Sequence, residues 1–341
     1  MERPPHLLPL LLLLTAVASS SAAAAPEAIR LPAGWAQSCP AAAPACQAAY
    51  DRPVIGIVTH PGDGTYEMRT YGAGTGASYI AASYVKLVES GGARVIPLVY
   101  NEPEERLFEK LSLVNGVLFT GGSQKNGSYF ETIRKVFQKN DAGEPFPLLA
   151  ECLGFELVSM IVSKDRDILE PFSALNQPST LQFPNYSFLE GSVFERFDPD
   201  LIKKLSTSLL VMQNHRYGIS PKRMEENDAL SSFFKILTTS PDENGKVYVS
   251  TVQAHKYPII CTQWHPEKAI FEWGEATTPH SEDAVQVTQH FANYFISQAR
   301  KSPNRPPADK VLKNLIHNYS PRFGTSISFD EVYIFSTDVD A

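Results

Sequence analysis

Apolar and polar positions follow two periodicities along the first half of the chain. A β-branched run at 54–59 ends at Pro61, and apolar residues then repeat at helical spacing from Ile80 through Tyr84 and Val88 up to Gly91. The pattern recurs, with strands expected at 94–99, 116–120 and 147–151 and helices at 104–111 and 129–138. This alternation predicts a flavodoxin-like α/β fold of three α-β-α layers around a central, mostly parallel sheet.

The second half of the chain carries further strand-like runs and one long helical segment. A turn from Asp242 to Gly245 separates two of the runs, which predicts a small antiparallel hairpin. The expected strands cover 209–213, 234–239, 247–253 and 259–263, and the helix covers 281–300. The chain beyond Ser302 is rich in proline and then polar, so residues 301–341 are expected to form a peripheral tail.

The N-terminus has the features of a secretory signal peptide. Arg3 precedes an apolar run from Leu7 to Val17, and small residues follow up to Ala25. A membrane anchor is the alternative, but the run is shorter than the roughly 20 residues that a spanning helix needs. We therefore expect a signal peptide at 1–25, an Ala/Pro-rich linker at 26–50 and the catalytic domain at 51–300, with no membrane association after the signal is removed.

Secretion would make two kinds of modification available. Cys39 and Cys46 either form a disulfide or remain two thiols in the linker; both alternatives are open at this point. Asn126 and Asn185 each fit the rule for N-linked glycosylation acceptors.

Charge and motif content exclude two classes of ligand. The chain has 30 Lys and Arg against 37 Asp and Glu, a net charge of −7, and so offers no basic surface for a nucleic-acid backbone. It has neither a C-x-x-C pair nor an H-E-x-x-H motif. We therefore expect no nucleic-acid partner, no metal and no cofactor.

The first chemical signal is a lone cysteine between a strand and a helix. The apolar strand that ends at Glu151 leads into Cys152, Leu153 and Gly154, and a helical pattern follows. Such a nucleophile elbow exposes its side chain at the carboxyl edge of the sheet, and it needs small neighbours because backbones approach closely there. Amides at the start of the helix would lower the thiol pKa, and the Leu153 N–H would point toward an oxyanion. A buried structural cysteine is the alternative.

The second signal follows the last expected strand of the sheet. His265 and Glu267 stand two residues apart, so on an extended chain they would share a face and the carboxylate could orient the imidazole. Alone, this segment could be a surface turn. Together with Cys152, it supplies a nucleophile, a base and an orienting group.

Two further segments could complete such a site. Two glycines follow the strand that ends at Thr120, and the Gly122 N–H could be the second oxyanion donor rather than part of an ordinary turn. His215 and Arg216 follow another apolar strand and could bind a substrate carboxylate, although a surface histidine is the alternative.

The motifs resemble those of class I glutamine amidotransferase-like hydrolases. The shared pieces, in chain order, are FTGG, ECLGFE and QWHPE. Within this group the chain is most similar to γ-glutamyl hydrolase (peptidase family C26), through RPVIGIVTHPGDG, SYIAASYVKLVESGGARVIPL and QNHRYGIS. The resemblance covers about residues 52–300.

This resemblance implies a function and assigns roles. Cys152 would be the nucleophile, His265 the general base and acid, Glu267 the orienting residue and His215 a second active-site histidine. The substrates would be folylpoly-γ-glutamates, cleaved without a cofactor in a vacuole, lysosome or extracellular space, often by a homodimer. Because these substrates are polyanionic, cations such as Arg216 or Lys256 would contact their carboxylates.

One departure from the family pattern concerns the nucleophile elbow. The family usually has Gly two residues before the nucleophile, where this chain has Ala150. The extra methyl is either absorbed or displaces Cys152. The alternative function is therefore a catalytically impaired relative that acts as a binding or storage protein. A glutaminase module of a synthetase is disfavoured, because the segment after Glu267 is too short for an ATP-using domain.

Overall fold

The computed structural model describes residues 49–62, 76–142, 146–323 and 329–336. These residues belong to one compact unit, Gln47–Ala341. The expected signal peptide, and Cys39 with Cys46, lie outside the described residues.

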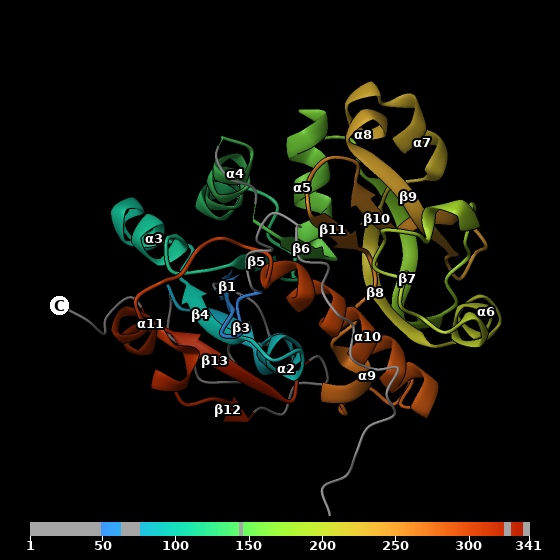
Figure 1. Cartoon of the computed structure of the whole chain (residues 1–341). Helices are drawn as coiled ribbons and strands as arrows, with labels where there is room; N and C mark the ends of the chain where they lie inside the picture. The colour runs from blue at the N-terminus through green and yellow to red at the C-terminus, as the bar shows by residue number, and fades with distance from the viewer. Residues whose placement is uncertain (1–48, 63–75, 143–145, 324–328, 337–341) are drawn as a thin grey trace, which may run out of the picture. The chain divides into compact units, whose positions relative to one another are not determined.

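A seven-stranded sheet forms the centre of this unit and confirms the predicted fold class (Figure 1). Its first five strands run parallel to one another, and the last two strand pairings across the sheet are antiparallel. In order across the sheet, the strands are β4 (Arg94–Leu98), β1 (Val54–Val58), β5 (Gly116–Phe119), β6 (Leu148–Glu151), β11 (Ile259–Thr262), β10 (Val247–Ala254) and β9 (Phe234–Pro241).

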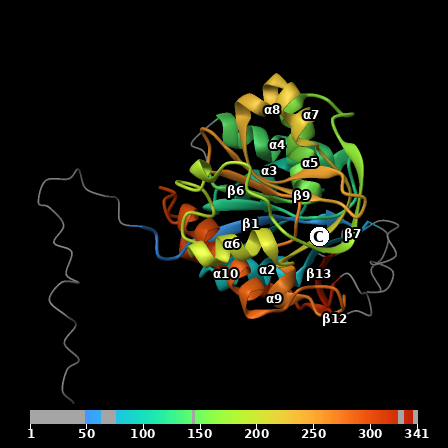
Figure 2. The same ribbon diagram turned by 90° about the vertical axis from the view of Figure 1, so that its right-hand side faces the viewer.

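Helices bury both faces of the sheet, as Figure 2 shows. In β1, Ile55 and Ile57 point into one apolar cluster, while Val54 and Val58 point into the other, because successive side chains alternate across a strand. The helices of the first cluster are α2 (Ala82–Ser90), α6 (Pro199–Thr207), α9 (Lys268–Phe271) and α10 (Glu282–Ala299). Those of the second are α3 (Glu104–Leu111), α4 (Gly127–Ala142), α5 (Leu153–Ser163), α7 (Pro221–Glu226), α8 (Asp228–Phe233) and α11 (Ala308–Asn314).

The predicted hairpin and the predicted long helix are both present. Strands β9 and β10 pair antiparallel around a turn in which the Gly245 N–H donates to the Asp242 carbonyl at 2.9 Å. Gly245 has φ +78°, a conformation that favours glycine. Helix α10 begins after Ser281, whose hydroxyl accepts a hydrogen bond from the Ala284 N–H.

The segment after α10 differs from the expected peripheral tail. It forms α11, η2 (Ile316–Asn318) and two strands of a second sheet, in which Val332 and Phe335 are buried. The Glu331–Phe335 strand is a short apolar run between polar segments, and it is stabilised by pairing with a strand far away in the sequence. The order of this sheet is β12 (Arg322–Phe323), β13 (Glu331–Phe335), β3 (Ser78–Ala81) and β2 (His60–Pro61).

A third, two-stranded sheet pairs β7 (Glu170–Ser179) with β8 (Val211–Gly218), and the single-turn helix η1 (Tyr186–Phe188) follows β7. Among the helices that the structure describes, none combines the length and apolar character needed to span a membrane. The carboxyl ends of β1, β5, β6 and β11 meet at one edge of the central sheet, where ligands of open α/β sheets bind.

Candidate active site

Cys152 occupies a strained position between β6 and α5. Its φ is +50° and its ψ −104°, a conformation that non-glycine residues rarely adopt. The Cys152 N–H donates to the Thr262 carbonyl of β11 at 2.7 Å, and its carbonyl accepts from the Glu156 N–H at 3.0 Å. A Cβ on Gly154 would lie 2.7 Å from the Phe119 carbonyl oxygen, so the position after next requires glycine. These features are those of a nucleophile elbow.

His265 and Glu267 form a hydrogen-bonded pair beyond β11. His265 Nδ1 lies 2.9 Å from Glu267 Oε1, and both side chains are buried. The expected extended chain is absent, because β11 ends at Thr262 and Glu267 has helical dihedrals at the N-cap of α9. The two side chains meet through this turn in the chain. His265 Nε2, on the other side of the ring from Nδ1, has no hydrogen-bond partner.

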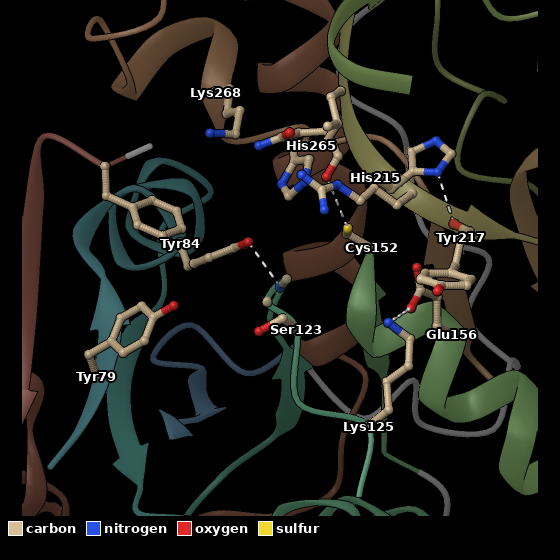
Figure 3. Close-up of a pocket in the computed structure, with 16 residues that line it drawn as sticks. Tyr79, Tyr84, Ser123, Lys125, Cys152, Glu156, His215, Tyr217, His265 and Lys268 are labelled. Carbon is tan, nitrogen blue, oxygen red and sulfur yellow. Dashed lines mark hydrogen bonds and ion pairs between the residues drawn. The ribbon is translucent and has the colours of Figure 1, made fainter. Parts of the chain in front are cut away.

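A cavity of about 440 Å³ brings most of the predicted residues together (Figure 3). Gly121 lies against both His265 and Cys152: a Cβ added there would lie 2.9 Å from His265 Cε1 and 3.5 Å from Cys152 Cβ. Gly122, His215 and Arg216 also line the cavity. Leu153 is not among the lining residues, but its backbone amide lowers the pKa of the Cys152 thiol. Glu267 lies behind His265, and the exposed Lys256 is not part of the lining.

Comparisons with known proteins give the family. Residues 75–281 match the class-I glutamine amidotransferase family model. The gamma-glutamyl hydrolase 2 of Arabidopsis thaliana is 62% identical over 291 residues, which cover 84% of this chain and 83% of that protein. The gamma-glutamyl hydrolases of Glycine max and Homo sapiens are 54% and 34% identical and cover 83% of this chain, with 84% and 90% of their own lengths covered. The chain belongs to the γ-glutamyl hydrolase family.

The pKa of the Cys152 thiol is raised, whereas the sequence predicted a lowered value. Burial, and then the Glu156 carboxylate, raise the pKa of the Cys152 thiol, although Lys125 and the Leu153 amide act in the opposite direction. The thiol is accordingly protonated, and Cys152 Sγ lies 3.8 Å from the Asn214 carbonyl oxygen, to which it donates. The helix amide lowers the pKa as predicted, but desolvation outweighs it.

Ala150 fits the sheet where the γ-glutamyl hydrolase pattern has glycine. It pairs in register with Phe119 of β5 and Cys261 of β11 and is fully buried in an apolar cluster. Its methyl therefore packs in the core on one face of β6, and Cys152 keeps its elbow conformation.

His215 is held as a neutral imidazole. Burial lowers its pKa to about 3, and nearby His265 acts in the same direction. Nδ1 lies 2.9 Å from the Tyr217 carbonyl oxygen, so it must carry the proton. The buried Nε2 has no hydrogen-bond partner and is therefore an acceptor on the cavity wall.

An ion pair between the half-buried Lys125 and the buried Glu156 lies in the cavity and was missed from the sequence. Lys125 Nζ lies 2.7 Å from Glu156 Oε2, and the ammonium stands 4.9 Å from the centre of the Tyr217 ring. Burial raises the pKa of Glu156 to about 7 in spite of Lys125. Glu156 lies one helical turn after Cys152 in α5, a spacing that could have indicated it.

His60 supports the loop that carries Gly122, and the motif RPVIGIVTHPGDG, which contains it, assigned it no role. Its Nε2 accepts hydrogen bonds from the Ser123 and Gln124 N–H groups at 3.2 and 3.4 Å. Burial lowers its pKa to about 4, so the ring is a neutral acceptor. Gly122 has φ +146°, and a Cβ there would lie 2.3 Å from the His60 ring. This close approach accounts for the second glycine of the pair.

Only one group of described side chains has the donor spacing of a metal site. The donor atoms of Glu151, His265 and Glu267 all lie within 4.8 Å of one another. A cation there would have to displace the hydrogen bond between His265 and Glu267 in a position closed to solvent. The arrangement therefore favours a hydrogen-bonded acid–base group over a metal centre.

Proposed function

We propose that this chain hydrolyses γ-glutamyl bonds through a thioester on Cys152. The observation that carries the proposal is the placement of a strained elbow cysteine and a carboxylate-oriented histidine against the same glycine, Gly121, in one cavity. The names of the relatives supply the bond that is cleaved.

The first half of the reaction forms the thioester. The Cys152 thiol gives its proton to His265 Nε2, and the sulfur attacks the γ-carbonyl carbon of the substrate. The resulting oxyanion accepts hydrogen bonds from the Leu153 and Gly122 N–H groups. When the C–N bond breaks, the His265 imidazolium gives the proton to the leaving α-amine.

The second half regenerates the enzyme. A water molecule gives one proton to His265 Nε2, and its oxygen attacks the thioester carbonyl. The C–S bond breaks, the γ-carboxyl group leaves, and the proton returns to Cys152. Glu267 keeps Nδ1 protonated throughout, so Nε2 is the nitrogen that exchanges protons.

The raised pKa of the Cys152 thiol is compatible with this sequence of steps. Because burial keeps the Cys152 thiol protonated, the site does not hold a buried thiolate before substrate arrives. Proton transfer then accompanies attack, when the oxyanion donors are in use.

We further propose that folylpoly-γ-glutamates are the substrates. The cavity volume falls in the range of small-molecule sites. Lys125 and Lys268 lie on its wall, and Arg216 is exposed at its edge, so cations are available for substrate carboxylates. Glu156 and the His215 Nε2 acceptor would receive the α-ammonium that cleavage creates on the released glutamate.

The decisive experiment is turnover of a pteroyl-polyglutamate by the purified protein beside two cysteine variants. Cys152→Ala should abolish release of glutamate or oligoglutamate, whereas Cys261→Ala, which alters the other buried cysteine of the described chain, should retain it. The lengths of the products separate endo from exo cleavage. No turnover by folded, reduced wild-type protein would favour the binding-protein alternative.

We also propose a route of the protein through the cell. Residues 1–25 would direct it to the secretory pathway, and a vacuole or the extracellular space would be its destination, with a homodimer as the possible assembly. Asn126 and Asn185 are exposed, as glycan acceptors must be. Sequencing the mature N-terminus tests the first step, since cleavage near Ala25 is expected.

A further inference from the structure

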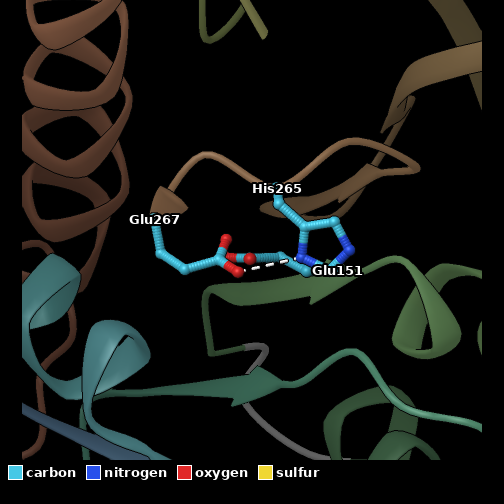
Figure 4. Close-up of side chains that lie close together, drawn as sticks. All are labelled: Glu151, His265 and Glu267. Atoms are coloured by element: carbon cyan, nitrogen blue, oxygen red, sulfur yellow. Dashed lines mark hydrogen bonds and ion pairs between the residues drawn. The ribbon is translucent and has the colours of Figure 1, made fainter. Parts of the chain in front are cut away.

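Glu151 is a buried carboxyl group that the proposed reaction does not use. It is the last residue of β6, directly before Cys152, and it is fully buried. Figure 4 shows its carboxyl group beside that of Glu267, which in turn bonds to His265. Two carboxyl groups thus meet in the interior behind the imidazole.

The carboxyl groups of Glu151 and Glu267 cannot both be ionised without a free-energy cost, because most of their oxygens lack hydrogen-bond donors. Glu267 Oε1 is paired with His265 Nδ1, but Glu267 Oε2 and both oxygens of Glu151 are buried without a hydrogen-bond partner. No described Lys, Arg or His forms an ion pair with Glu151. Carboxylates only accept hydrogen bonds, so two of them side by side would repel and leave three oxygens unsatisfied. A single proton between them removes the repulsion and satisfies two of the three oxygens.

The surroundings decide which carboxyl group holds the proton. Burial, and then the Glu267 carboxylate, raise the pKa of Glu151 well above its usual range. Burial acts on Glu267 too, but the neighbouring imidazole and Lys268 outweigh it, so the Glu267 pKa is lowered. The titratable groups around the pair are His265, Cys152 before α5, Tyr84 of α2, and Lys268 and Glu272 at the two ends of α9.

We propose that Glu151 is a positioning residue that stays protonated and donates a hydrogen bond to Glu267 Oε2, which fixes Glu267 Oε1 against His265 Nδ1. This role rests on the function proposed above, because it matters through the proton transfers of His265. The pair carries one negative charge in total. That charge stabilises the imidazolium formed during attack, and the Glu151 hydrogen bond prevents the carboxylate from rotating away.

Two substitutions of similar volume test this role through turnover. Glu151→Met fills the space but cannot donate, so kcat should fall about 10-fold to 100-fold with KM nearly unchanged, as when other supporting partners of a reactive group are removed. Glu151→Gln offers an N–H donor to Glu267 Oε2 and should recover most of that loss. The acid limb of its kcat/KM profile should coincide with that of the wild type.

The pH profile separates the proposal from a structural role or an ionised Glu151. If Glu151 were a carboxylate, Glu151→Gln would remove a negative charge close to His265 and move the acid limb down by more than about one pH unit. Such a shift, or equal losses in the Met and Gln variants, would overturn the proposal.

An infrared measurement tests the proton without turnover. At about pH 9, roughly two units above the pKa of about 7 for Glu156 and Glu272, those groups are ionised. A carbonyl band of a protonated carboxylic acid should then remain in the wild type and in Glu156→Gln, and be lost in Glu151→Gln. An unchanged spectrum in Glu151→Gln would refute the protonated state. Wild-type protein that shows the band but no turnover would disprove the proposed function and leave the protonated state of Glu151 established.

Discussion

Gly121→Ala offers a test of the geometry around the imidazole and the thiol, because it adds one methyl group against both His265 and Cys152. The added Cβ would lie 2.8 Å from Tyr84 Oη, 2.9 Å from His265 Cε1 and 3.5 Å from Cys152 Cβ. Ordinary contacts begin at 3.4 Å, so the ring must retreat by about 0.5 Å, against its hydrogen bond to Glu267. Gly121 is not among the residues with positive φ, so alanine meets this crowding and no backbone penalty.

The expected magnitudes follow from this crowding. Overpacking costs about 1–3 kcal/mol of unfolding free energy. Misplacement of a reacting group on the ångström scale can cost about 100-fold in rate, so we expect kcat to fall by roughly that factor or more. Steady-state turnover of a pteroyl-polyglutamate and urea denaturation measure the two effects.

Gly127→Ala is the matched control. Gly127 has φ +65°, and a Cβ there would have no neighbour within 4 Å, so the variant should lose about 1 kcal/mol of stability through backbone strain and keep its turnover. If Gly121→Ala retained wild-type kcat at a comparable loss of stability, the imidazole and thiol would not face each other across this glycine during the reaction.

Three further outcomes are expected. Glu267→Gln should lower kcat about 1,000-fold or more, as when the carboxylate of other triads is neutralised, whereas Glu272→Gln at the other end of α9 should have a small effect on turnover. The pKa of Glu156 is raised from 4.5 to about 7. Its contribution to the free energy of unfolding is therefore present below pH 4.5 and lost as pH rises through 7. Urea denaturation should show this free energy falling by up to about 3 kcal/mol over that range in the wild type but not in Glu156→Gln. The pKa of His60 is lowered from 6.5 to about 4, so its contribution is present above pH 6.5 and lost as pH falls through 4. Wild-type protein should lose up to about 3 kcal/mol over that range relative to His60→Gln, and identical pH curves would contradict the assignment.

The fold could be predicted from the sequence wherever local pattern and burial agree. The strand at Val54 and the turn at Gly245 follow from β-branched runs and glycine placement, which act over a few residues. Ile80 was expected to begin a helix but lies in β3, because pairing with β13 overrides its helical spacing. That pairing joins distant segments and leaves no local signal.

The same distinction applies to the candidate site. Cys152 and His265 could be predicted because each stands at a strand end within a compact motif. His60 and Glu151 could not, since their significance depends on which side chains the fold brings against them. The direction of the thiol pKa was also missed, because desolvation is a property of the packed interior and no short motif reports it.

The second sheet has a consequence for the order of events at the ribosome. β13 leaves the exit tunnel after every strand of the central sheet, yet it pairs with β3, and Phe329, just before it, forms part of the cavity wall. The nascent chain can fold its central sheet before these residues emerge, but the cavity is complete only once Phe329 and β13 have followed it. Completion of the reaction chamber is therefore a later event than folding of the central sheet.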